Sequence, residues 1–95
     1  MDINTQWGEF CNRPFPDDLA GVEIDGICIT SLDSAAAGCI STYVDNGGCL
    51  DSERIRVLQT CSNELERINP LIRDDSRYFN KLAELIHGVL AEIHQ

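Results

Sequence analysis

The sequence predicts an all-α fold, a small antiparallel three-helix arrangement that follows an irregular N-terminal arm. Apolar residues recur at helical spacing in three segments, and each segment lies between capping residues and a glycine or proline. The chain has 95 residues, a length typical of one domain. We therefore expect a single domain, with an irregular acidic arm over residues 1–30 and three helices over residues 31–95.

Residues 1–21 are expected to be irregular, because Pro14 and Pro16 forbid a regular helix between them. Three aromatic residues anchor this segment: Trp7, Phe10 and Phe15. A large aromatic side chain is normally buried for its apolar area. We expect these residues to pack onto the helical core of the chain itself, rather than onto a partner.

Residues 22–29 are the only strand-like part of the chain. Apolar and acidic residues alternate at its start, and Asp25-Gly26 is compatible with a tight turn. A two-stranded hairpin with arms of about three residues is marginal in water. We expect an extended lead-in to the first helix, with a very short strand or hairpin as the alternative.

The first helix is predicted over residues 32–45. Thr30 or Ser31 can cap it, and Asp33 places a negative charge in its first turn. Gly47 and Gly48 follow the helix and are expected to end it. Its apolar face consists of Leu32, Ala36, Ile40 and Tyr43.

The second helix is predicted over residues 52–69, with Asp51 or Ser52 as its cap. Pro70 predicts either a break at this point or one short extra turn. The apolar face is formed by Ile55, Leu58, Cys61 or Ser62, Leu65 and Ile68.

The third helix is predicted over residues 76–94, with Asp74 or Asp75 as its cap. It has the strongest apolar pattern in the chain, and Gly88 within it indicates a close helix crossing. Because this apolar face is wide, either the N-terminal arm or a second subunit should cover it. The second alternative makes the stripe the seam of a homodimer or larger oligomer: Phe79, Leu82, Ile86, Val89 and Ile93.

The charge of the chain is strongly acidic and unevenly distributed. Sixteen Asp and Glu face seven Lys and Arg, a net charge of −9, of which residues 1–50 carry −7 and residues 51–95 carry −2. This balance argues against binding to nucleic acid or to an anionic membrane. The excess in the first half indicates a basic protein partner, with solubility as the simpler alternative. The candidate partner-binding residues are Asp17, Asp18, Glu23, Asp25 and Asp33.

No residue pattern predicts catalysis, a cofactor or a metal. The five cysteines include no C-x-x-C pair, and the two histidines are seven residues apart, too far for chelation from one helix. Most of the cysteines are expected to be buried, reduced hydrophobes, and a thiol-based redox or metal-binding protein is an alternative. The start of the chain lacks the basic and apolar regions of a secretory signal, and no apolar run is long enough to span a bilayer. We therefore expect a cytoplasmic protein.

Taken together, these features predict a non-enzymatic, acidic helical module that binds another protein. An inhibitor or immunity-type protein directed against a basic partner would have this size and charge. The alternatives are a helical homo-oligomer with a structural or adaptor role, and the thiol or metal protein.

Overall fold

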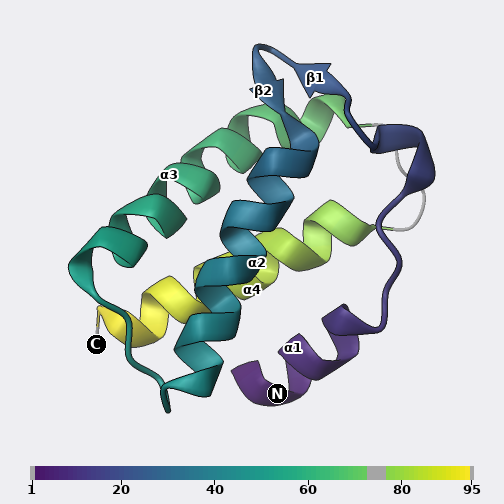
Figure 1. Cartoon of the computed structure of the whole chain (residues 1–95). Coiled ribbons are helices and arrows are strands. Elements are labelled where there is room, and N and C mark those ends of the chain that lie inside the picture. Colours follow the sequence, from purple (N-terminus) through teal and green to yellow (C-terminus); the bar gives the residue numbers. More distant parts are fainter. Residues whose placement is uncertain (1, 73–76, 95) are drawn as a thin grey trace.

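Four α-helices and one small hairpin make up the computed structural model, which describes residues 2–72 and 77–94 (Figure 1). The all-α class is confirmed. The predicted count of three helices is wrong, because part of the N-terminal arm is itself helical. The elements in chain order are α1 (Ile3–Cys11), the 3₁₀ turn η1 (Asp17–Leu19), β1 (Glu23–Ile24), β2 (Ile27–Cys28), α2 (Ile29–Asp45), α3 (Ser52–Ile68), the 3₁₀ turn η2 (Asn69–Leu71) and α4 (Tyr78–Ile93).

Helix α1 corrects the expectation that residues 1–21 are irregular. Asp2 caps it, since the Asp2 carboxylate accepts a hydrogen bond of 2.7 Å from the backbone N–H of Thr5. Ile3 and Phe10 are buried and Trp7 is half-buried, at a spacing of four and three residues that places all three on one face. The aromatic residues of the arm do pack onto the chain's own core, as predicted.

The hairpin forms, although an extended lead-in was the favoured expectation. Glu23 pairs with Cys28 and Ile24 with Ile27 in an antiparallel register. Helix α2 follows without a break and begins three residues earlier than predicted. Its N-cap residue is Cys28 rather than Thr30 or Ser31.

The boundaries of α3 agree well with the sequence. The carboxylate of Asp51 accepts a 2.8 Å hydrogen bond from the backbone N–H of Arg54, which is the predicted cap. The helix ends at Ile68, and Pro70 lies in the extra turn η2. For α4, the proposed caps Asp74 and Asp75 lie outside the described residues. Arg77 directly precedes α4, in the left-handed conformation.

The hydrophobic core contains residues of all four helices. Helix α4 lies at its centre and packs against α1, α2 and α3. Gly88 marks the crossing of α4 with α1, as predicted, since a Cβ atom at Gly88 would lie 2.6 Å from Ile3 Cδ1. No helix in the described part of the chain is long and apolar enough to cross a bilayer.

Candidate functional site

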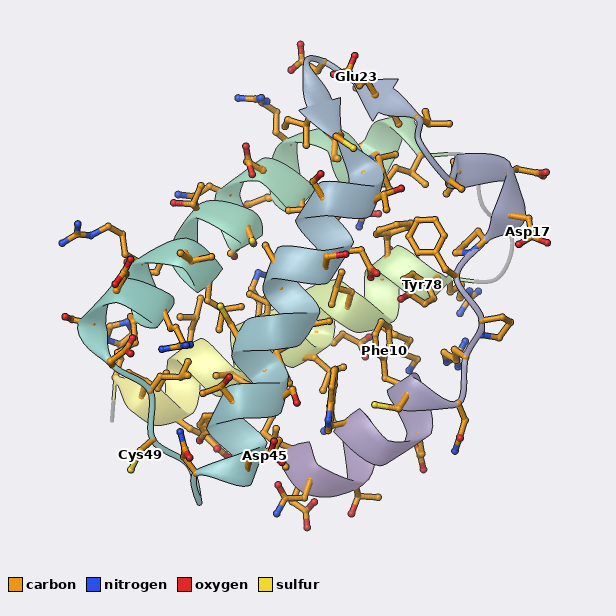
Figure 2. The ribbon with its side chains drawn as sticks, in the orientation of Figure 1. Phe10, Asp17, Glu23, Asp45, Cys49 and Tyr78 are labelled. Atoms are coloured by element: carbon orange, nitrogen blue, oxygen red, sulfur yellow. The ribbon has the colours of Figure 1, made fainter. Side chains whose placement is uncertain are left out.

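The candidate site is the acidic end of the molecule, which we define as η1 and the hairpin with the side chains of Asp17, Asp18, Glu23 and Asp25. Two separately anchored loops form it. Figure 2 shows Asp17 and Glu23 on these two loops, whereas Asp45 lies at the opposite end of α2.

The first loop is held by apolar contacts on both sides of its acids. Leu19 is buried at 8% exposure, and its backbone N–H donates a 3.0 Å hydrogen bond to the carbonyl of Pro16. Upstream, the Phe15 ring packs edge-on against Tyr78 and Phe79, at centroid distances of 5.5 and 5.8 Å. The side chains of Asp17 and Asp18 are exposed on a backbone that is fixed from both directions.

The second loop is a tight turn that needs a special backbone. Asp25 and Gly26 have φ angles of +54° and +79°, the left-handed conformation at both positions that a type I′ hairpin turn requires. Buried Ile27 anchors the turn to the core, and Glu23 is exposed on β1.

Asp25 has a structural role that the sequence analysis did not assign to it. Its carboxylate forms a 3.0 Å salt bridge with Arg67 Nε, which joins the hairpin to the last turn of α3. Both side chains are more than half exposed, so this ion pair contributes at most about 1 kcal/mol. Asp25 is thus partly neutralised, and it is a weaker candidate for partner binding than the other acids of this end.

Asp33 does not belong to the acidic end as an exposed charge. It is half-buried in α2 and accepts a 2.8 Å hydrogen bond from the Tyr78 hydroxyl at the start of α4. Burial raises the pKa of Asp33, and the hydrogen bond from Tyr78 acts in the opposite direction. It is also the fifth residue of α2 rather than a first-turn residue. Asp33 therefore joins two helices instead of facing solvent.

A salt bridge joins Arg67 to Asp25 at this end, and the side chains of the other three acids are exposed. Asp17, Asp18 and Glu23 thus present three carboxylates to solvent on anchored loops.

The predicted oligomer seam is part of the core of the single chain. Ile93 is half-buried, and the other four residues of the stripe are at most 2% exposed: Phe79, Leu82, Ile86 and Val89. The N-terminal arm, through α1, covers α4 together with α2 and α3. While the chain keeps this fold, its own helices cover these four residues, as expected for the alternative in which the arm covers the stripe.

The thiols and histidines lie apart from one another. All five cysteines are free; Cys39 and Cys61 are buried, whereas Cys11 and Cys49 are exposed. The expectation that most cysteines are buried is therefore wrong, since only two are. Hydrogen bonds from Ser31 lower the pKa of half-buried Cys28. No group of three or more His, Cys, Asp or Glu side chains in the described ranges is arranged to hold a metal ion.

One groove beside the acidic end was not anticipated from the sequence. It has a volume of about 180 Å³ and lies between the end of α3 and the middle of α4. Leu71, in η2 next to this groove, is 57% exposed and is the most exposed large hydrophobic residue in the part of the chain that the structure describes. The proline at position 70 was the only sequence signal for this feature. The groove is lined by Ser62, Leu65, Glu66, Asn69, Pro70, Ala83 and His87.

No family model matches the chain, and neither the curated proteins nor the solved structures gave a match.

Proposed function

We propose that this chain is a non-enzymatic interaction module that binds a basic protein partner through its acidic end. The observation that carries the proposal is the display of three exposed carboxylates on two anchored loops: Asp17, Asp18 and Glu23. The uneven charge of the sequence supports it, since residues 1–50 carry a net charge of −7.

Anchoring of the loops favours binding for an entropic reason. Association costs free energy for every segment that must become ordered at the interface. Here Leu19 and Ile27 are already buried, and Phe15 already packs on the core, so the backbone that presents the acids is in place before a partner arrives. The acids can then contribute their attraction to a basic surface without that cost.

Electrostatics also determines what kind of partner fits. A surface with one sign of charge speeds the encounter with an oppositely charged surface and disfavours acidic proteins. Because these side chains are exposed, their contribution should weaken with added salt. An inhibitor or immunity-type protein that covers a basic surface is one function of this class.

The test compares two triple variants that make the same change in net charge, from −9 to −6. The site variant carries Asp17→Asn, Asp18→Asn and Glu23→Gln. The control variant changes exposed acids of α1, α2 and α3 and carries Glu9→Gln, Asp45→Asn and Glu53→Gln. The probe is a synthetic lysine–serine peptide, and calorimetry measures its affinity at two salt concentrations.

We expect the site variant to bind the peptide about tenfold more weakly than the natural chain, and the control variant to lose no more than about threefold. Circular dichroism should show that both variants are folded. Equal losses in the two variants would contradict the proposal, because they would mean that only the total charge matters.

A further inference from the structure

We propose that the partner segment is amphipathic as well as basic, and that its apolar side chain docks in the groove between α3 and α4 while its lysines or arginines face the acidic end. This inference rests on the proposed function and specifies the chemistry of the partner. It requires that the groove can accept an apolar side chain, that it lies beside the acidic end, and that its surroundings favour a basic segment.

The groove has an apolar interior. Leu65 forms part of its lining at 1% exposure, and Pro70 and half-buried Ala83 contribute further apolar surface. Its volume of about 180 Å³ suits an apolar side chain rather than a whole cofactor, since sites for drug-sized ligands have about 300–1,000 Å³.

Leu71 extends this apolar surface beyond the groove. It directly follows Pro70 and is 57% exposed. The other exposed large hydrophobic residue, Val57, is 38% exposed, does not line the groove and lies near the start of α3. A partner segment that runs from the groove across Pro70 to Leu71 would bury this side chain too, and the burial of apolar surface would add to the affinity.

The groove and the acidic end are neighbours in the fold. The Asp25–Arg67 salt bridge of 3.0 Å joins the hairpin turn to the last turn of α3, and the groove residues Asn69 and Pro70 follow that turn. Figure 1 shows the hairpin beside the end of α3, at the same end of the molecule as η1.

Charge complementarity selects the occupant. Glu66 lines the groove and is exposed, and it adds a carboxylate to those of the acidic end. A second copy of the chain would bring a further net charge of −9 to this surface, which disfavours self-association here. A basic segment with an apolar face satisfies both surfaces at once, an arrangement in which apolar anchors are surrounded by polar contacts.

The test uses two peptides of equal length and charge, an amphipathic lysine–leucine peptide and the lysine–serine peptide. Leu71→Ser removes the exposed apolar residue, Ala83→Met fills the groove, and Val57→Ser is the matched control on an exposed hydrophobic residue elsewhere. All three positions are at least partly exposed, and circular dichroism verifies that each variant is folded.

We expect the natural chain to bind the lysine–leucine peptide about tenfold more tightly than the lysine–serine peptide. Leu71→Ser and Ala83→Met should each remove most of this preference, and Val57→Ser should keep it. Equal affinity for the two peptides would overturn the groove inference and leave the acidic end intact. A preference that persists in both groove variants would also overturn it. Failure of both peptides to bind would overturn the proposed function itself.

Discussion

The close crossing of α1 and α4 at Gly88 determines whether an alanine at this position stabilises or destabilises the chain. Replacing a glycine inside a helix by alanine gains about 1 kcal/mol from helix propensity alone. At Gly88, however, the new Cβ atom would lie 2.6 Å from Ile3 Cδ1. Carbon atoms pack best at about 3.5–4.0 Å, so the side chain or the helix must move by about 1 Å. A shift of Ile3 away from its rotamer costs about 0.5–1.5 kcal/mol.

We therefore expect Gly88→Ala to change the free energy of unfolding by no more than about 0.5 kcal/mol in either direction, because the cost at Ile3 cancels the gain in helix propensity. Gly38→Ala is the matched control, because no atom lies within 4 Å of a Cβ at this position of α2, and it should gain about 1 kcal/mol. In an Ile3→Val background, which lacks Cδ1, Gly88→Ala should gain about 1 kcal/mol as well.

Urea unfolding followed by circular dichroism measures all of these variants. A change of 1 kcal/mol corresponds to about 4–8 °C in the melting temperature of a chain this size, so thermal unfolding provides a second readout. If Gly88→Ala stabilises the natural chain as much as Gly38→Ala does, Ile3 does not pack against Gly88 and the close contact between α1 and α4 is absent.

Three further predictions concern single side chains. Burial raises the pKa of Asp33, so the folded chain binds this proton more tightly than the unfolded chain, and stability should fall as the pH rises from about 3.8 through the raised pKa. Asp33→Asn should remove this loss, because its amide oxygen can still accept the hydrogen bond from Tyr78, and urea unfolding at several pH values measures the difference. A thiol reagent should label Cys11 and Cys49 first, and mass spectrometry that finds a buried cysteine labelled equally fast in the native chain would contradict the core described above. Ile86→Asp should unfold the chain, since Ile86 is 0% exposed. If light scattering instead shows that the natural chain is an oligomer and that the variant is a folded monomer, the stripe on α4 is an oligomer seam.

Local chemistry explains which elements were predictable. Helix α3 was placed within one residue at its end because Asp51 caps its start and Pro70 lies just beyond it. The glycines after α2 end that helix as expected, with Gly48 N–H donating a 2.9 Å hydrogen bond to the Tyr43 carbonyl. Each of these signals acts within a few residues of the boundary that it fixes.

Helix α1 was missed, although its signals were present. Asp2 is a good capping residue, and Ile3, Trp7 and Phe10 follow a helical period. The prolines at positions 14 and 16 lie beyond the helix and say nothing about the residues before Cys11.

The features of the candidate site that depend on distant partners were not predictable. Asp33 and Tyr78 are 45 residues apart, and only the folded chain shows that their hydrogen bond removes Asp33 from the exposed acids. The same holds for the pairing of Asp25 with Arg67 and for the groove beside Leu71. The acidic character of residues 1–50 was visible in the sequence, but which acids remain exposed depends on the tertiary packing.

In the proposed mode of binding, a basic partner contacts the acidic end and does not respond to the total negative charge alone. The most direct test is a nuclear magnetic resonance titration of the ¹⁵N-labelled full chain with the lysine–serine peptide. If the acidic end binds the peptide, the largest backbone shifts will fall on residues 17–19 and 23–26, where the exposed acids lie. Shifts of equal size around Asp45 and Glu53, at the other end of α2 and at the start of α3, would contradict it.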